Sequence, residues 1–166
     1  MMRIITGSAR GLKLEAPEGL TTRPTSERAK MGVFNILQFE IAGKRVLDLF
    51  AGSGQMGLEA LSRGAARAVF VDESREAVQV IRENLEKTRL GDLAAVRQCE
   101  AMQYLDTARE TFDLVILDPP YAEKFLENAI KKISEIDILS SSGIIICERP
   151  ADKLLPESYP GLQRWR

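Results

Sequence analysis

The chain contains no histidine, and only two cysteines and one tryptophan among its 166 residues. Without histidine, a zinc site of the Cys and His type cannot be assembled, and any general base has to be a carboxylate, another group or water. Cys99 and Cys147 lie inside apolar runs rather than at metal-ligand spacing, so we expect neither a metal site nor a structural disulfide. We therefore predict no metal chemistry. We expect any catalysis to depend on carboxylates and on the positioning of the reactants.

Long apolar runs are also missing. No stretch of about 18 uncharged apolar residues occurs, and residues 1–7 lack the apolar core of a secretory signal. We therefore expect a cytoplasmic protein that does not contact a membrane. With 166 residues, 45% of them hydrophobic and 28% charged, the chain is long enough for one domain with a single core, and we expect a monomer.

The net charge of -1 conceals an asymmetry along the chain. Residues 1–45 carry eight Lys or Arg against four Asp or Glu, whereas residues 46–166 carry fifteen against twenty. A basic segment joined to an acidic body favours a polyanion that docks at one end. Ordinary solvated charge accounts for the same numbers equally well.

Apolar runs alternate with helical periodicity after residue 45, which predicts an α/β fold with a doubly wound, mostly parallel sheet. Before it, segments 3–6 and 11–14 predict a small hairpin, and a helix capped by Thr25 or Ser26 should end near Ala42 and Gly43. We divide the chain into an N-terminal extension, residues 1–44, and a catalytic domain, residues 45–166. The expected strands lie near 46–49, 68–71, 94–97, 114–117 and 144–147, and the expected helices near 56–63, 74–89, 102–108 and 124–133.

The first predicted strand runs into a glycine-rich turn with the spacing G-x-G-x-x-G, formed by Gly52, Gly54 and Gly57. In a doubly wound sheet, this pattern places bare backbone at the carboxyl end of the first strand, where a ligand can approach closely. Alone, the pattern fits a dinucleotide site or a plain tight turn equally well.

Acidic residues at strand ends narrow the choice of ligand. Asp72 ends the second strand, where a carboxylate can accept hydrogen bonds from ribose hydroxyls. Asp48, just before the glycine turn, would repel a pyrophosphate but suits a cationic amino-acid moiety such as that of S-adenosylmethionine (SAM). Glu100 follows the third strand and is placed to hold an adenine amino group. The alternative for Asp72 and Glu100 is that they only begin the next helices.

The fourth strand delivers the sequence Asp118-Pro119-Pro120-Tyr121 at its carboxyl end. Two prolines stiffen the turn, so it presents acceptors and an aromatic ring on a rigid mount. The Asp118 carboxylate and the Pro119 carbonyl can accept the two N–H groups of an exocyclic base amine and direct its lone pair at the SAM methyl group. Tyr121 can stack on a base withdrawn from its helix. An isolated tetrapeptide of this kind is equally compatible with a structural turn.

Together these patterns predict catalytic residues Asp118, Pro119, Pro120 and Tyr121, with SAM as methyl donor and S-adenosylhomocysteine as product. The predicted cofactor-binding residues are the glycine turn, the strand-end acids and their neighbours: Asp48, Phe50, Gly52, Ser53, Gly54, Asp72, Glu73, Glu100, Ala101 and Asp118.

The motifs resemble those of class I SAM-dependent methyltransferases, and Asp-Pro-Pro-Tyr is similar to the loop of enzymes that methylate amino nitrogens. The N-terminal segments 3–7, 10–14 and 23–28, with Phe34-Asn35, resemble the signature of the RsmD-type bacterial 16S ribosomal RNA guanine-N2 methyltransferases. Segments 50–54 and 57–65 are similar to the same family. The resemblance covers nearly the whole chain.

This resemblance implies methylation of one guanine of small-subunit ribosomal RNA, in an assembled or partly assembled particle. It also implies phosphate contacts by the basic side chains Arg3, Arg10, Lys13, Arg23 and Arg28, which position RNA without reading its sequence. The chain departs from the family at Glu27, where aspartate is usual, and at Met31, where an acid is usual. The family is similar to folds whose last two strands form a hairpin. Because residues 162–166 fall about where the sixth strand should start, we expect either that this strand pair is shortened here or that the sequence belongs to a longer natural chain.

Other functions remain open from the sequence alone. Related loops serve methylation of DNA adenine, of other RNA bases and of protein amides. A non-catalytic RNA-binding module is a further alternative, although Asp48, Asp72 and Asp118 together argue against it. A nicotinamide dehydrogenase is disfavoured by Asp48 and by the Asp-Pro-Pro-Tyr turn.

Overall fold

The computed structural model describes residues 2–18, 27–119, 122–149, 155–156 and 158–164. Its helices are α1 (Glu27–Ile36), α2 (Gln55–Ser62), α3 (Arg75–Thr88), α4 (Ala101–Thr107) and α5 (Ala122–Ile136), with a short 3-10 helix, η1 (Gly91–Leu93). Its strands are β1 (Arg45–Asp48), β2 (Arg67–Asp72), β3 (Ala94–Gln98), β4 (Phe112–Leu117), β5 (Leu139–Cys147), β6 (Ser158–Tyr159) and β7 (Leu162–Gln163).

The first five strands form one sheet in the order β3-β2-β1-β4-β5, and every neighbouring pair is parallel. The chain moves outward from β1 to β3 and then returns to place β4 on the other side of β1. Ligands of open α/β sheets bind at the carboxyl ends of the strands where the order reverses in this way. The predicted doubly wound parallel sheet is confirmed, and its switch point lies between β1 and β4.

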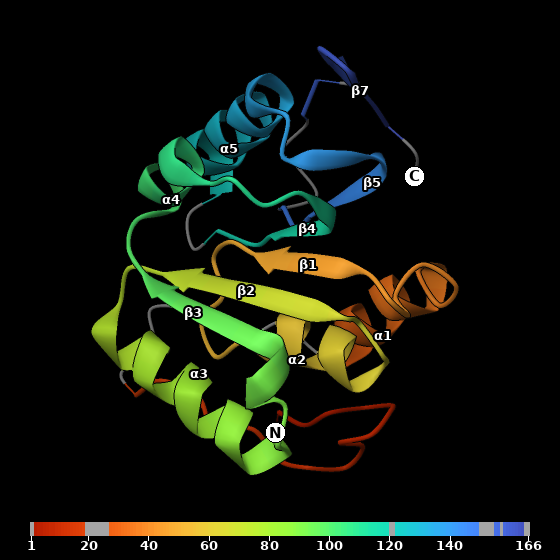
Figure 1. The fold of residues 1–166 in the computed structure, drawn as a ribbon, viewed down its shortest axis with the longest axis vertical. Coiled ribbons are helices and arrows are strands. Elements are labelled where there is room, and N and C mark those ends of the chain that lie inside the picture. The colour runs from red at the N-terminus through yellow and green to blue at the C-terminus, as the bar shows by residue number, and fades with distance from the viewer. Residues whose placement is uncertain (1, 19–26, 120–121, 150–154, 157, 165–166) are drawn as a thin grey trace.

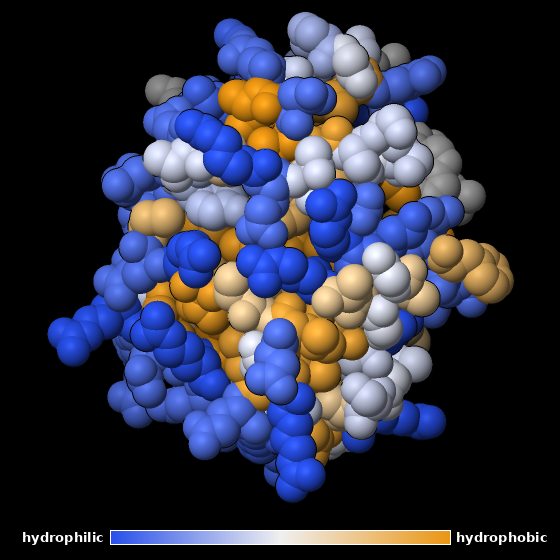
Figure 2. All heavy atoms as spheres, viewed as in Figure 1, coloured by the Kyte–Doolittle hydropathy of each residue, from blue (hydrophilic) through white to orange (hydrophobic). Residues whose placement is uncertain are grey.

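Helices cover both faces of the sheet (Figure 1). Successive strand residues point to opposite faces, so Val46 and Ala68 pack in one apolar cluster with α1, α2 and α3, whereas Leu47 and Val69 pack in the other with α4 and α5. In the space-filling view, hydrophilic residues cover most of the visible surface and apolar ones show between them (Figure 2). The helices thus bury the sheet from both sides and leave its strand ends for a ligand.

The N-terminal arm, defined here as residues 2–15, forms the predicted hairpin, with an antiparallel bridge between Arg3 and Lys13. The Ile4 N–H donates to the Leu12 carbonyl at 3.0 Å, and the Leu14 N–H donates to the Met2 carbonyl at 2.9 Å. Three of its apolar side chains are buried in the same cluster as α2 and α3: Ile4, Ala9 and Leu14. The arm is therefore packed against the body of the molecule.

Helix α1 ends at Ile36, six residues before the predicted end near Ala42 and Gly43, because the chain turns at residues 37–39 and buries Leu37 and Ile41. The predicted caps of this helix, Thr25 and Ser26, lie outside the described residues.

The other predicted helices and strands are present with shifts of a few residues, except at β5. This strand begins at Leu139, five residues before the predicted 144, because the polar run Ser140–Ser142 gives no apolar signal. Leu139 pairs with Phe112 across a register irregularity in β4. The last two strands, β6 and β7, form an antiparallel hairpin separate from the five-stranded sheet within the described residues. In this described part of the chain, no helix is long and apolar enough to cross a membrane.

Candidate active site

The turn between β1 and α2 is held by carboxylates from two neighbouring strands. The Gly52 N–H donates to Asp72 Oδ2 at 2.9 Å, and the Gly57 N–H donates to Asp48 Oδ2 at 3.0 Å. The other oxygen of Asp72 accepts the Ser74 N–H at 2.9 Å, at the start of α3. We call residues 50–54 the cofactor loop. The two acids predicted to bind a ligand also fix the shape of this loop.

Each glycine of the predicted motif occupies a position where another residue would be strained or would lack space. Gly52 and Gly54 adopt φ angles of +56° and +81°, in the left-handed region where side chains are strained. Gly57 lies where α2 crosses β2, and a Cβ atom there would lie 2.4 Å from Cε1 of Phe70. Around the Cβ position of Gly52, in contrast, no atom of the described residues lies within 4 Å, apart from Gly52 itself and its two chain neighbours. The backbone of Gly52 is therefore open to a ligand.

Three carboxylates gather at this edge of the sheet. Asp48 ends β1, Asp72 ends β2 and Asp118 follows β4, and β1 lies between the other two strands. Asp48 is only 2% exposed. Its burial raises its pKa to about 7, the charges of Asp118 and Asp72 add to the rise, and the Gly57 N–H opposes it. A cationic ligand such as the amino-acid and sulfonium part of SAM would relieve this repulsion, so the residues present fit that group.

The turn predicted to be catalytic, residues 118–121, is described as far as Pro119. Asp118 is half-buried and Pro119 is buried, directly after the last residue of β4. Pro120 and Tyr121, the other predicted catalytic residues, lie outside the described residues. The described half of the turn lies beside the end of β1, as the predicted chemistry requires.

The remaining predicted cofactor residues lie around this centre. Ser53 is buried in the cofactor loop and Phe50 is half-buried at its start. Glu73 is exposed, directly after β2. Glu100 is exposed at the N-terminus of α4, without a capping hydrogen bond from its side chain, and Ala101 is the first residue of that helix. Because β3 is the outer strand next to β2, Glu100 lies one strand further from β1 than Asp72 does.

Of the basic residues predicted to contact RNA, those in the described segments are exposed: Arg3, Arg10, Lys13 and Arg28. Arg3 forms an ion pair with Glu27, with 3.2 Å between Nε and Oε1. Arg23 lies outside the described residues. Three of these exposed cations belong to the arm hairpin: Arg3, Arg10 and Lys13.

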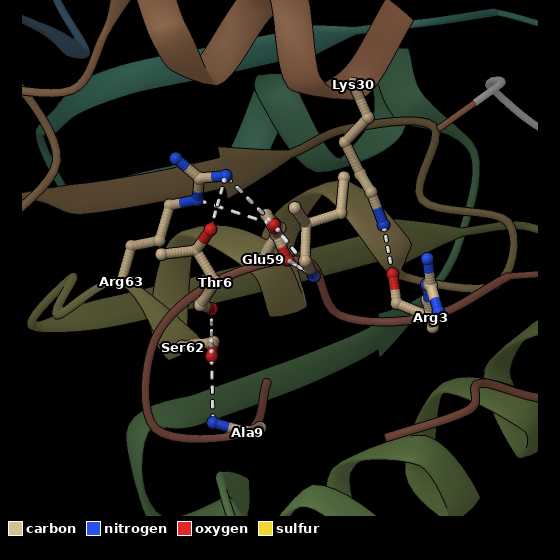
Figure 3. Close-up of polar contacts among 8 residues, drawn as sticks. Arg3, Thr6, Ala9, Lys30, Glu59, Ser62 and Arg63 are labelled. Carbon is tan, nitrogen blue, oxygen red and sulfur yellow. Dashed lines mark hydrogen bonds and ion pairs between the residues drawn. The ribbon is translucent and has the colours of Figure 1, made fainter. Parts of the chain in front are cut away.

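Sequence patterns did not predict the buried polar residues of α2 that hold the arm (Figure 3). Both carboxylate oxygens of the buried Glu59 accept the Ile5 N–H, at 3.1 and 3.0 Å. Ser62 Oγ accepts the Ala9 N–H at 2.9 Å and donates to the Thr6 carbonyl at 2.7 Å. The arm passes so close that a Cβ atom on Gly7 would lie 1.8 Å from the Ser62 carbonyl oxygen.

Lys30 of α1 completes this network from the other side. Its side chain is buried, and Nζ donates to the Arg3 carbonyl at 2.6 Å. Burial lowers the pKa of Lys30, while the charge of Glu59 opposes the change. The Arg63 guanidinium lies 3.1 Å from Glu59 Oε1 and 4.8 Å from the centre of the Phe34 ring. Helices α1 and α2 therefore hold the arm backbone through a buried ammonium on one side and a buried carboxylate on the other.

Asn84 of α3, which is fully buried, is a further residue that the sequence patterns did not predict. Its side chain exchanges hydrogen bonds with the backbone of Glu15 and donates one to the Ser53 carbonyl. One sequence feature could have revealed it: Asn84 lies at helical spacing on the apolar face that contains Ile81 and Leu85. A polar residue on such a face needs buried partners.

Comparison with known proteins agrees with this geometry. The family described as Conserved hypothetical protein 95 matches residues 2–166. YlbH of Bacillus subtilis (strain 168) is 41% identical over 164 residues, covering 97% of this chain and 89% of the relative. Ribosomal RNA small subunit methyltransferase D of Escherichia coli (strain K12) is 36% identical over 155 residues, covering 93% of this chain and 78% of the relative.

Among solved structures, the hypothetical protein TTHA0928 of Thermus thermophilus superposes with a TM-score of 0.85 at 33% identity, covering 96% of this chain and 92% of that one. The relatives and structural neighbours include methyltransferases with this fold, so the predicted enzyme class, a SAM-dependent methyltransferase, is confirmed. The chain belongs to the family described as Conserved hypothetical protein 95, whose relatives include the ribosomal RNA small subunit methyltransferases D.

Proposed function

We propose that this chain transfers the methyl group of SAM to the exocyclic N2 amine of a guanine in 16S ribosomal RNA. The observation that carries the proposal is the convergence of Asp48, Asp72 and Asp118 around the cofactor loop at the carboxyl ends of three neighbouring strands. The names of the relatives support ribosomal RNA of the small subunit as the substrate class.

SAM supplies a methyl group on a sulfonium, which is already electrophilic. The protein therefore has to bind the donor, exclude competing geometries and align the amine. Asp48 lies where it can hold the cationic amino-acid part, and Asp72 lies where it can accept from ribose hydroxyls. Glu73, Glu100 and Ala101 would contact the adenosine part of SAM. Phe50, the first residue of the cofactor loop, would contact it from the side of that loop.

The acceptor amine is a weak nucleophile, because its lone pair is delocalised into the base. The Asp118 carboxylate and the Pro119 carbonyl would accept its two N–H groups, which would turn the lone pair toward the methyl group and stabilise the positive charge that develops on nitrogen. As the N–C bond forms, the bond from sulfur to the methyl group would break and S-adenosylhomocysteine would leave. The methylated amine would then release one proton to the Asp118 carboxylate or to water. Pro120 and Tyr121 are assigned to the same turn, with Tyr121 stacking on the extruded guanine.

Exposed cations of the N-terminal extension, residues 1–44, are assigned to the RNA backbone. Arg10 and Lys13 on the arm and Arg28 on α1 face solvent, where they can contact phosphates. We place the reaction in the cytoplasm, on an assembled or partly assembled small subunit, and we expect the enzyme to act as a monomer.

The test is transfer of labelled methyl from SAM onto small ribosomal subunits, free 16S RNA, duplex DNA and protein, followed by mass spectrometry of the labelled product. We expect N2-methylguanine at one position of 16S RNA. Label on DNA adenine, on another RNA base or on protein would overturn the proposed acceptor. Binding of SAM without transfer to any of them would indicate a non-catalytic RNA-binding module.

Asp118→Ala tests the assigned catalytic group, and we expect turnover to fall by roughly 10²- to 10⁴-fold. Asp118→Asn keeps one acceptor oxygen, so an orienting role predicts partial retention of activity. Asp113→Ala is the matched control, because Asp113 lies on the same strand at its opposite end and interacts with Arg45. Equal losses of turnover in Asp118→Ala and Asp113→Ala would remove Asp118 from the mechanism.

A further inference from the structure

The side chain of Asn84 joins two segments that are remote in sequence. Its Oδ1 accepts the Glu15 N–H at 2.8 Å, and its Nδ2 donates to the Glu15 carbonyl at 3.0 Å and to the Ser53 carbonyl at 3.0 Å. Both N–H groups of the amide are thus used, one on the end of the arm and one on the cofactor loop. The side chain is fully buried, so water cannot replace a broken hydrogen bond without a large cost in free energy.

Other contacts place the arm against the same loop. Ser53 Oγ lies 3.1 Å from the sulfur of Met2, at the beginning of the arm. Helix α2 begins directly after Gly54 and carries Glu59 and Ser62, which bind the arm backbone. The loop is therefore connected to the arm directly through Ser53, through α2, and through Asn84 of α3.

We propose that Asn84 is a positioning residue that couples the arm to the cofactor loop, so that SAM and RNA each favour binding of the other. The inference rests on the proposed function, in which the loop holds SAM and the arm contacts RNA. A ligand that restricts the Ser53 backbone also restricts Glu15 through the shared amide, so the second ligand orders a segment that is already held. Such coupling is reciprocal and typically changes affinity by about 5- to 150-fold.

Asn84→Asp isolates this coupling. Aspartate keeps the shape and the acceptor for the Glu15 N–H, but it removes both donors and places a carboxylate oxygen against the carbonyls of Glu15 and Ser53. Thr88→Val is the matched control one turn further along α3. Thr88 is also buried, and among the described residues its hydroxyl donates to two carbonyls of its own helix, those of Asn84 and Leu85.

The experiment measures binding of S-adenosylhomocysteine by calorimetry and the hydrogen exchange of arm amides with and without saturating ligand. In the wild type and in Thr88→Val, we expect ligand to slow exchange at Ile4, Gly11 and Leu14, whose N–H groups donate to carbonyls of the arm. We expect the same at Glu15, whose N–H donates to Asn84 Oδ1. In Asn84→Asp, we expect the dissociation constant to rise about five-fold or more, and the protection of the arm to disappear at saturation.

The wild-type measurement alone decides the matter if Asn84→Asp does not fold. Ligand binding without slower exchange in the wild-type arm overturns the coupling and leaves the proposed function standing. Absence of ligand binding to the wild type overturns the proposed function itself. A folded Asn84→Asp variant that keeps full protection of the arm removes Asn84 from the connection.

Discussion

At the scale of single residues, Asp48 carries a conflict between folding and ligand binding. Its carboxyl group is 2% exposed, and burial raises its pKa from the ordinary 3.8 to about 7. Between these two pH values, the folded chain holds a proton that the unfolded chain has released. The stabilising contribution of this group is therefore fully present below pH 3.8 and is lost as the pH rises through about 7.

We therefore expect Asp48→Asn to raise the melting temperature of the ligand-free protein at pH 8, with a smaller gain at pH 5. The amide keeps an acceptor for the Gly57 N–H without placing a charge in the interior. Each pKa unit corresponds to about 1.4 kcal/mol, so a gain of several degrees is expected. Scanning calorimetry at the two pH values measures it, and equal gains at both would contradict the buried-charge account.

The same residue predicts how SAM affinity depends on pH. The ionised carboxylate attracts the cationic donor, so wild-type affinity should fall as the pH drops below 7, approaching tenfold per pH unit in the limit. In Asp48→Asn the affinity should be weak, and this component of its pH dependence should be absent. Titration calorimetry from pH 6 to 8 distinguishes the two proteins; parallel curves would show that another group controls binding.

At the scale of elements, the glycines of two helices differ in how closely they are packed. Gly57 of α2 lies against Phe70 of β2, and a Cβ atom there would lie 2.4 Å from the ring. Within the described part of the chain, Gly32 of α1 has no atom within 4 Å of its Cβ position outside its own stretch of helix. Glycine costs up to about 1 kcal/mol in a helix relative to alanine. At Gly57 the close packing against Phe70 offsets this cost, because a larger residue would clash with the ring.

The two alanine substitutions should consequently differ in sign. Gly32→Ala should stabilise the protein by about 0.5–1 kcal/mol, whereas Gly57→Ala should destabilise it by about 1–3 kcal/mol because α2 has to move from the sheet. Urea unfolding measures both free energies. Adding Phe70→Leu should recover part of the loss from Gly57→Ala, and strictly additive effects would show that the ring is not the obstacle.

At the scale of the whole molecule, local sequence patterns predict those parts of the fold that depend on periodicity. Apolar runs locate all five strands of the parallel sheet, and the strand ends then place Asp48, Asp72 and Asp118 at one edge, because parallel strands share their direction. The start of β5 is missed, since backbone pairing with β4 rather than apolar side chains extends it through Ser140–Ser142.

The anchors of the arm could not be predicted in the same way. Glu15 and Asn84 are 69 residues apart, and Ile5 and Glu59 are 54 apart. Periodicity describes the face of one element and does not say which backbone group will meet it. The boundary placed at residue 44 thus separates two segments that share one apolar cluster and one buried polar network.

This close packing still leaves the outer side of the arm hairpin to solvent, and the final prediction concerns its charges. Arg10 and Lys13 are both exposed. If they contact phosphates, Arg10→Ala combined with Lys13→Ala should weaken RNA binding and reduce the slope of log K against log salt by about 1.5. Filter binding to 16S RNA between low and moderate salt measures this slope.

The matched control removes two other exposed cations, Arg109 after α4 and Lys131 on α5, on the opposite face of the sheet. Both double variants lose the same net charge, so a general electrostatic effect would lower the two slopes equally. Direct phosphate contact instead predicts a reduced slope only for the arm variant, with its affinity for S-adenosylhomocysteine retained. An unchanged slope for the arm variant would show that the hairpin serves the fold and the cofactor loop without touching RNA.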